Sequence, residues 1–301
     1  MLEACDRIKS KFGPDCSFYF PASGFTTYKA GGPLEVLVKP STIADLAWLR
    51  KLCAENKITF LALGGGSNIL VSDKGLKGVV ALTRKIDKIE ISGDLLIAEA
   101  GALWDHVVQA SVKAGLAGLE KTSGIPGTVG GAVFMNAGAF GQETFDTLEN
   151  FYVMDAAGTV KTLKKSEVKY GYRKVDGLEG WTIIKAVFRL KVGNKNLLEA
   201  DRSRVLAARA EKQPLDFPSA GSVFKRPPGD FASRLIDAAG LKGLAVGGAK
   251  VSEKHAGFIV NAGGARASDI YALIKKVKAE VKARTGVTLE LEQILLGDFE
   301  D

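Results

Sequence analysis

Two glycine-rich loops constrain the fold of this chain more than any other feature. The first loop, residues 64–68, follows an apolar run at residues 58–63 that is typical of a buried strand. Residues 69–73 then read as another strand, not as a helix. This order excludes a Rossmann loop, whose G-x-G-x-x-G pattern leads into a helix, and no G-x-x-x-x-G-K-[ST] P-loop is present either. Taken alone, the first loop is a weak signal for a nucleotide site and is better explained by a tight connection.

The second glycine-rich loop, residues 123–131, favours a ligand site over a tight connection. A third glycine-rich stretch follows at residues 136–141. Backbone amides next to glycine approach a ligand closely and form anion-binding nests. Two such loops on separate lobes would hold a pyrophosphate from both sides, and Pro126 would stiffen one of them. A nucleotide site is therefore expected.

The rest of the first two thirds of the chain is strand-rich. Apolar runs predict strands at residues 34–38, 79–82, 89–91, 95–98, 151–154, 160–163 and 183–190. One helix is expected to start after Ser41 or Thr42. A second helix is predicted to end at Gly115 and to bury Leu103, Val107, Ala110 and Ala114 on one face.

The last third is helical, and residues 192–196 form the best candidate for a domain boundary. A charged helix is expected near residues 199–211. The last helix is predicted to be capped by Ser268, to end at Gly286 and to bury a face formed by Ile270, Leu273, Ile274, Val277 and Val281.

Length and composition limit the function classes. A chain of 301 residues predicts two or three domains. No apolar run reaches the ~20 residues that span a bilayer, and no secretory signal is evident, so we expect a cytoplasmic protein that does not bind membranes. With three cysteines in no C-x-x-C pair and only two histidines, we expect reduced thiols and no metal site. The net charge of +7 suits a small polyanion or nucleic acid, and charge alone does not separate them.

Six polar residues outside the loops are weighed here for a chemical role. Ser222 is not in a G-x-S-x-G elbow, and a free hydroxyl donates a proton only to a strong base, so it otherwise reads as a turn serine. Arg173 lies among tyrosines, where its planar fork would fit a carboxylate or its stem would simply pack. Glu290 and Glu292 alternate as in a strand and read by default as solvent-facing. His255 would be structural or ligand-facing, and His106 a surface residue.

The motifs together resemble the UDP-N-acetylenolpyruvoylglucosamine reductase family, in its short form without a substrate-covering insertion. The resemblance runs from about Thr26 to Gly297. It is carried by residues 26–32, 64–68, 123–131, 136–141, 172–173, 218–225, 251–255 and 289–292. The order and spacing of so many motifs make the resemblance specific.

The resemblance implies an α+β fold, in which a two-lobed FAD-binding region of the vanillyl-alcohol-oxidase-like type precedes a smaller α+β substrate domain. The FAD-binding region would span residues 1–195, with lobes at about 1–77 and 78–195, and the substrate-binding domain would span residues 196–301. The glycine loops would hold FAD non-covalently through Gly64, Gly65, Gly66, Ser67, Asn68, Ser123, Gly124, Ile125, Pro126, Gly127, Thr128, Gly130 and Gly131.

The implied reaction is the NADPH-dependent reduction of UDP-N-acetylglucosamine enolpyruvate. Hydride delivered to the methylene carbon leaves an enolate-like species, which is the strong base that makes a serine acid plausible. Ser222 would donate the proton, and Arg173 and Glu292 would stabilise the intermediate. Tyr172, Lys225 and Arg226 would bind the substrate. A monomer without nucleic-acid partners is expected.

The sequence departs from the family pattern at three positions. Val175 stands where a serine is frequent, two residues after the arginine. Arg226 replaces a frequent asparagine and would instead bind the diphosphate, and Ser233 replaces a usual glycine.

Two alternatives remain open at this point. One is an FAD-dependent oxidase of the same binding fold that acts on an alcohol or sugar. Such enzymes often tether flavin through histidine or cysteine, and the glycine loops contain neither. The other is a basic nucleic-acid-binding protein, which would be colourless and would show a steep salt dependence. It leaves the loops and the serine, arginine and glutamate unexplained.

Overall fold

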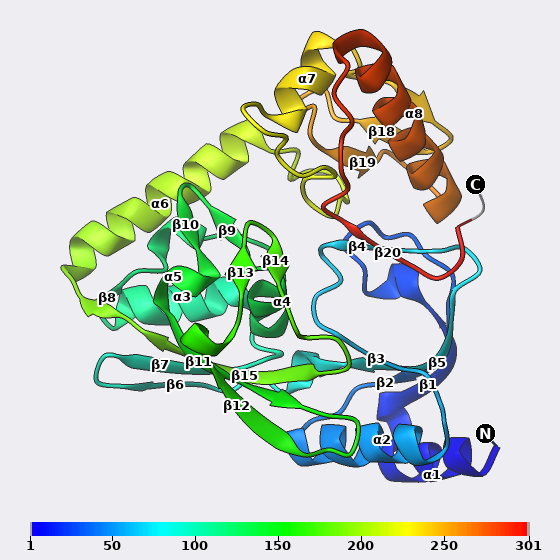
Figure 1. Cartoon of the computed structure of the whole chain (residues 1–301), viewed down its shortest axis with the longest axis vertical. Coiled ribbons are helices and arrows are strands. Elements are labelled where there is room, and N and C mark those ends of the chain that lie inside the picture. Colours follow the sequence, from blue (N-terminus) through cyan, green and yellow to red (C-terminus); the bar gives the residue numbers. More distant parts are fainter. Residues whose placement is uncertain (1, 300–301) are drawn as a thin grey trace. The chain divides into compact units, whose positions relative to one another are not determined.

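The computed structural model describes residues 2–299, and the chain forms two compact units (Figure 1). The first unit comprises Met1–Phe18, Val36–Gly65 and Gly78–Arg209, and the second comprises Tyr19–Glu35, Gly66–Lys77 and Ala210–Asp301. Each unit is therefore assembled from separate stretches of the chain, whereas the predicted domains are continuous. No helix in the described part of the chain is long and apolar enough to cross a lipid bilayer.

The N-terminal part of the first unit is a sheet covered by two helices. The strands lie in the order β1 (Cys16–Pro21), β2 (Pro33–Val38), β5 (Leu76–Leu82) and β3 (Phe60–Leu63), and the helices are α1 (Leu2–Phe12) and α2 (Ile43–Glu55). The α2 helix begins as predicted, because the Thr42 side chain accepts a hydrogen bond from the Asp45 amide at 3.0 Å. Ile8, Leu46, Leu49 and Val79 belong to the core between sheet and helices.

The larger part of the first unit contains a five-stranded antiparallel sheet and several helices. The strand order is β12 (Val160–Lys164), β11 (Leu148–Met154), β15 (Thr182–Arg189), β7 (Leu95–Glu99) and β6 (Ile89–Ser92). The helices are α3 (Trp104–Lys113), α4 (Val129–Phe134), α5 (Thr144–Thr147) and α6 (Lys195–Lys212). Short strands pair as β8 (Leu116–Ala117) with β16 (Lys191–Val192), β9 (Gly138–Ala139) with β10 (Gln142–Glu143), and β13 (Tyr170–Gly171) with β14 (Lys174–Val175). Single 3₁₀ turns lie at Gly13–Asp15, Ala22–Gly24, Thr83–Lys85, Glu120–Thr122 and Lys165–Glu167.

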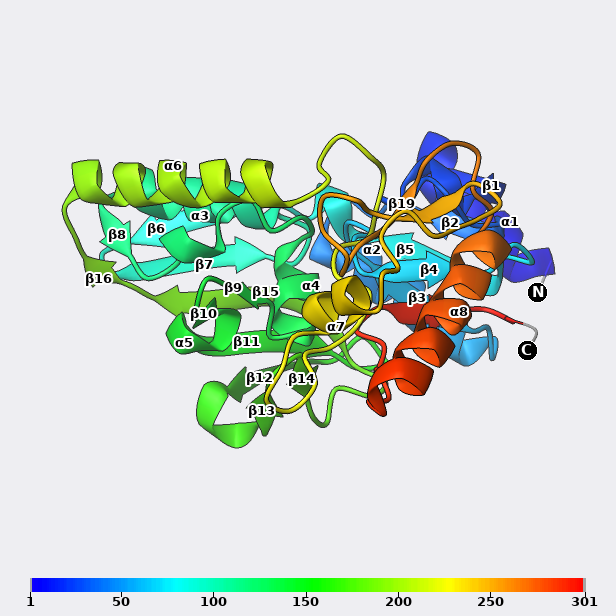
Figure 2. The ribbon, with the colours of Figure 1, turned by 90° about the horizontal axis from the view of Figure 1, so that it is seen from above.

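The buried face of α3 differs from the predicted one. The helix buries Trp104, Val107, Val108, Ser111 and Val112, whereas Ala114 is exposed. Trp104 decides this orientation, because its large ring packs edge-to-face on Phe188 and its Nε1 donates to Thr122 Oγ1 at 3.0 Å. Gly115 ends the helix as predicted, with a left-handed φ of 71°. The α6 helix lies alongside α3 (Figures 1 and 2).

The second unit packs helices on a small antiparallel sheet. Its strands are β17 (Ala245–Val246), β18 (Ala249–Val251) and β19 (Ile259–Asn261), and its helices are α7 (Ala232–Ala238) and α8 (Ala267–Thr285). A separate parallel pair joins β4 (Ile69–Val71) to β20 (Ile294–Leu296). The predicted face of α8, from Ile270 to Val281, lies in the core of this unit.

The predicted cap of α8 is wrong. Arg266 occupies the N-cap position, and Ser268 lies inside the first turn. The cap comes from a distant residue, since the Asp73 carboxylate accepts hydrogen bonds from the amides of Ala267 at 2.8 Å and Ser268 at 2.9 Å. Gly286 ends the helix as predicted, with φ at 76°.

Candidate active site

Two of the glycine-rich loops meet inside the first unit. Gly64 and Gly65 follow β3, and Gly127 and Thr128 precede α4. A Cβ atom added to Gly64 would lie 2.0 Å from Thr128 Oγ1, and one added to Gly65 would lie 3.0 Å from the Cα of Gly127. Only glycine permits this approach, so the sequence pattern reflects a contact between the loops.

Polar groups at this contact are left without protein partners. Thr128 is 2% exposed, and its Oγ1 forms no hydrogen bond within residues 2–299. The amides of Gly64 and Gly65 likewise donate to no acceptor in the described part of the chain. An unsatisfied buried polar group costs about 1–3 kcal/mol. A hydroxyl and two amides that face no protein group fit a ligand rich in hydrogen-bonding oxygens, such as a dinucleotide.

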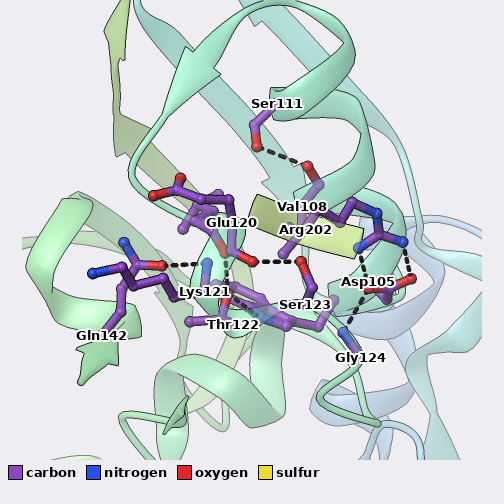
Figure 3. A network of polar contacts seen from close by, with 12 residues as sticks. Asp105, Val108, Ser111, Glu120, Lys121, Thr122, Ser123, Gly124, Gln142 and Arg202 are labelled. Atoms are coloured by element: carbon purple, nitrogen blue, oxygen red, sulfur yellow. Dashed lines mark hydrogen bonds and ion pairs between the residues drawn. The ribbon is translucent and has the colours of Figure 1, made fainter. Parts of the chain in front are cut away.

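The remainder of the second loop is held by the protein itself. Ser123 Oγ donates to Glu120 O at 2.5 Å (Figure 3), and the Ile125 amide donates to Thr122 O at 3.3 Å. The amides of Val129 and Gly130 donate to Ala102 O and Ala100 O, each at 2.9 Å. Pro126 lies on the same loop, just before its bend at Gly127, and Gly131 lies in the first turn of α4. These contacts position the loop independently of any ligand.

The residues of the first loop that follow Gly65 belong to the second unit. Gly66 has a φ of 63°, and its carbonyl accepts a hydrogen bond from the Thr27 amide at 3.2 Å. Ser67 follows, and Asn68 Nδ2 donates to Glu292 O at 3.2 Å. The loop thus contributes to both units through consecutive residues.

An ion pair fixes the start of the second loop (Figure 3). Arg202 of α6 donates two parallel hydrogen bonds to the Asp105 carboxylate of α3, at 2.6 and 2.7 Å, and Asp105 Oδ1 also accepts from the Gly124 amide at 2.7 Å. Gly124 adopts a φ of 72°. The Arg202 hydrogen bond is the main reason that the pKa of Asp105 lies below its usual value, and the Gly124 amide lowers it further.

We expect stability to depend on pH through Asp105. Because its folded-state pKa lies below the unfolded value near 3.8, its contribution is present above pH 4 and is lost as the pH falls through the folded pKa. Asp105→Asn should lower the free energy of unfolding at pH 7 by about 1–2 kcal/mol, a range that allows for solvent screening. Urea unfolding at pH 7 and pH 3 should show the gap between the two proteins closing in acid. An equal gap at both values would contradict the role given to this carboxylate.

Arg173 lies at the turn of the hairpin formed by β13 and β14. Its backbone adopts a left-handed φ of 55°, which is uncommon for a residue with a side chain. Arg173 NH1 donates to Asn136 O at 3.3 Å and NH2 to Gly138 O at 2.8 Å, and the guanidinium lies over the Tyr172 ring at 4.9 Å. These contacts hold the charge of Arg173 in a defined place.

Asn136 organises the surroundings of this hairpin and is fully buried. Its Nδ2 donates to Glu143 Oε2 at 2.7 Å and to Gly171 O at 3.1 Å. Its Oδ1 accepts from the Phe145 amide at 3.0 Å. One side chain therefore ties the start of α5 to the hairpin that carries Arg173.

Ser222 and Glu292 lie on neighbouring segments of the second unit. The amide of Glu292 donates to Val223 O at 2.9 Å, and Phe224 and Leu291 form an isolated antiparallel bridge.

Glu292 is half-buried, whereas the Glu290 side chain is 76% exposed and lies 3.7 Å from the ammonium of Lys225. Arg226 is exposed and lies over the Phe231 ring at 4.7 Å. The two glutamates are thus in different environments.

Gln293 fixes the backbone just before Ser222. It is 3% exposed, and its Nε2 donates to Ala220 O at 3.0 Å and to Gly221 O at 3.3 Å. Its Oε1 accepts from the hydroxyl of Tyr28 at 3.0 Å. Complete burial raises the pKa of Tyr28, so the phenol stays protonated and remains a donor.

Residue patterns did not identify Asp105, Arg202, Asn136 or Gln293. Their partners are distant in sequence, as with Asp105 and Arg202, so no local motif marks them. The one available signal was Asn136, which lies in a recognised motif without an assigned role.

His255 is half-buried, and burial lowers its pKa.

Comparisons with known proteins decide the family. A protein named UDP-N-acetylenolpyruvoylglucosamine reductase from Clostridium beijerinckii is 44% identical over 272 residues, covering 90% of each chain. Residues 213–296 match the profile described as UDP-N-acetylenolpyruvoylglucosamine reductase, C-terminal domain. This chain belongs to the UDP-N-acetylenolpyruvoylglucosamine reductase family. Residues 34–164 match the profile described as FAD binding domain, which confirms the FAD prediction.

Solved structures confirm the predicted fold. The UDP-N-acetylenolpyruvylglucosamine reductase from Thermus caldophilus has a TM-score of 0.81 and 36% identity, and the match covers 92% of this chain and 98% of that one. A glucose dehydrogenase, Phl p 4.0202, has a TM-score of 0.50 at 14% identity, covering 64% of this chain and 44% of that one. The second likeness shows only that the fold of about two thirds of this chain is shared beyond the reductase family.

Proposed function

We propose that this chain is an NADPH-dependent flavoenzyme that reduces UDP-N-acetylglucosamine enolpyruvate to UDP-N-acetylmuramate for peptidoglycan synthesis. The observation that carries the proposal is family membership over nine tenths of the chain. The glycine contact between Gly64 and Thr128, with its unpaired hydroxyl, supports FAD as the cofactor. FAD, when bound, supplies the hydride.

Ser222 is the proposed proton donor. Hydride addition at the methylene carbon converts the double bond of the enolpyruvyl group into an enolate-like anion. The Ser222 hydroxyl then donates its proton to the adjacent carbon, so its O–H bond breaks as the new C–H bond forms, and the alkoxide left on Ser222 takes a proton from solvent. Gln293, which binds the carbonyls of Ala220 and Gly221, holds the backbone just before this serine in place.

Arg173 and Glu292 are the proposed stabilisers of that anion. Arg173 places a positive charge that would face the substrate carboxylate, and the carbonyls of Asn136 and Gly138 orient it. Glu292 would act by hydrogen bonding to the protonated form of the intermediate or by polarising the site. Its half-buried position supports this role over that of Glu290, which is exposed beside Lys225.

Substrate and cofactor contacts complete the proposal. Tyr172, Lys225 and Arg226 would bind the UDP-sugar, and the residues of the two glycine loops would bind FAD without a covalent bond. The FAD-binding region would lie in residues 1–195 and the substrate-binding domain in residues 196–301. We also propose that the protein is a cytoplasmic monomer.

A visible absorption spectrum tests the proposal. Purified protein should show a flavin band, bleach with NADPH under anaerobic conditions, and regain colour when UDP-N-acetylglucosamine enolpyruvate is added. Return of colour with oxygen but not with the enolpyruvyl substrate would point to an oxidase of the same fold. A protein that stays colourless after addition of FAD would overturn the cofactor assignment as well.

A further inference from the structure

Two backbone carbonyls that lie two residues apart anchor the guanidinium of Arg173. Its NH1 donates to Asn136 O at 3.3 Å, and its NH2 donates to Gly138 O at 2.8 Å. Both carbonyls belong to the third glycine-rich stretch, residues 136–141, whose side chains have no role in the proposed reaction. The place of the Arg173 charge therefore depends on what fixes this stretch.

The Asn136 carbonyl is fixed by the backbone and by the side chain of its own residue. The backbone adopts a left-handed φ of 40°, which asparagine tolerates better than most residues. The buried Oδ1 accepts from the Phe145 amide at 3.0 Å, and because that amide can only donate, the orientation of the side-chain amide is settled. Nδ2 then donates to Glu143 Oε2 at 2.7 Å and to Gly171 O at 3.1 Å.

Glu143 contacts both residues whose carbonyls bind Arg173. Its Oε2 accepts from Asn136 Nδ2, and its backbone pairs with Gly138 in the hairpin of β9 and β10. A Cβ atom added to Gly138 would lie 2.8 Å from Glu143 Cγ, so these two residues pack closely. Glu143 is also the N-cap residue of α5, where the Asp146 carboxylate accepts from its amide at 2.8 Å. One half-buried glutamate thus links the cap of α5 to both anchors.

We propose that Glu143 and Asn136 are positioning residues that hold Arg173 for its part in the reaction. A guanidinium stabilises a developing negative charge best when its donors are oriented before that charge forms. A displacement of about 1 Å can cost ~10²-fold in rate. Asn136 is fully buried and acts through its carbonyl and through Gly171, two residues before Arg173. The inference rests on the proposed function, in which Arg173 faces the enolpyruvyl carboxylate.

Asn136→Gly tests the side-chain amide, because glycine keeps a left-handed backbone without strain. The FAD-loaded variant is followed by anaerobic stopped-flow absorbance at saturating NADPH and enolpyruvyl substrate. NADPH should bleach the flavin at the wild-type rate, and reoxidation by UDP-N-acetylglucosamine enolpyruvate should slow ~10–100-fold. An equal slowing of both half-reactions would show a general effect on the fold and would refute the proposal.

Substitutions of Glu143 test the same contact from its other side. Glu143→Ala removes the acceptor of Asn136 Nδ2 and should slow reoxidation ~10-fold. Glu143→Gln keeps an acceptor oxygen for Asn136 and should remain close to the wild type. Asp146→Ala is the matched control, because it removes the other half of the α5 cap and leaves the hydrogen bonds of Asn136 in place. A loss in Asp146→Ala as large as that in Glu143→Ala would assign the effect to α5 and contradict the proposal.

Ligand binding separates the positioning of Arg173 from a structural role. Isothermal titration calorimetry on the oxidised holoenzyme compares UDP, which lacks the enolpyruvyl carboxylate, with the complete enolpyruvyl substrate. Asn136→Gly should bind UDP like the wild type and the enolpyruvyl substrate more weakly. Equal weakening for both ligands would mean that the substitution disturbs the site as a whole, and the proposal would be wrong.

A double-mutant cycle decides whether Asn136 acts through Arg173. In the Arg173→Ala background, Asn136→Gly should slow reoxidation no further, because the group that it positions is already absent. Effects that multiply would overturn the proposal. Normal reoxidation in Asn136→Gly beside impaired reoxidation in Arg173→Ala would exclude this inference alone. Normal reoxidation in Arg173→Ala would remove the proposed role of Arg173 and this inference with it.

Discussion

Replacing Ser222 by alanine is expected to divide the catalytic cycle into an intact half and a blocked half. NADPH should bleach the flavin of the variant at the wild-type rate, because the hydroxyl takes no part in flavin reduction. Reoxidation by UDP-N-acetylglucosamine enolpyruvate should slow by at least ~10²–10³-fold, since the enolate-like anion loses its proton donor. Anaerobic stopped-flow absorbance measures each half separately.

Ser219→Ala is the matched control for this experiment. Ser219 lies three residues away on the same half-buried segment and has no assigned role. Both half-reactions should remain at wild-type rates in this variant. Normal reoxidation in the Ser222→Ala variant would remove Ser222 from the chemistry.

Arg173→Ala is expected to lose both substrate affinity and turnover. The guanidinium is proposed to bind the substrate carboxylate and to stabilise the charge that develops on it, so KM should rise and kcat should fall by ~10²–10³-fold. Arg173→Lys should recover only part of the rate, because an ammonium cannot form the hydrogen bonds to Asn136 O and Gly138 O with the same planar geometry. Steady-state kinetics with varied enolpyruvyl substrate checks both values.

Lys174→Ala serves as the control on the same hairpin. The Lys174 side chain is 71% exposed and pairs with Asp176, so its loss removes one positive charge without altering the contacts of Arg173. We expect kinetics close to those of the wild type. An equal fall in kcat and rise in KM in the two alanine variants would indicate a general effect of charge. Unchanged kcat and KM in the Arg173→Ala variant would exclude Arg173 from the site.

Sequence patterns predicted helices and strands correctly wherever the interaction that fixes them lies within a few residues. Thr42 caps α2 through an amide three residues away, and the apolar runs that flank the first glycine loop are strands. The buried face of α3 was misassigned because packing of Trp104 against Phe188, 84 positions later, sets its orientation. Ser268 was misassigned as a cap because Asp73 supplies that function from a remote segment.

The candidate site was predictable as motifs but not as contacts. The glycines of both loops were recognisable because their pattern is dense, and the resemblance assigned roles to Arg173, Ser222 and Glu292. Those three roles stay predictions. The contacts that support these residues follow no local pattern, since the Tyr28 hydroxyl donates to Gln293 Oε1 across 265 positions.

The parallel pairing of β4 with β20 has a consequence for how the protein is made. Ile69 pairs with Ile294, so the two strands of this sheet lie 225 positions apart in a chain of 301 residues. Until the ribosome has synthesised β20, β4 lacks its parallel partner strand. Its apolar residues Ile69, Leu70 and Val71 therefore stay unpaired during most of translation. The second unit therefore completes its folding only after β20 has been synthesised, and nascent chains halted before residue 294 should remain sensitive to proteases within it.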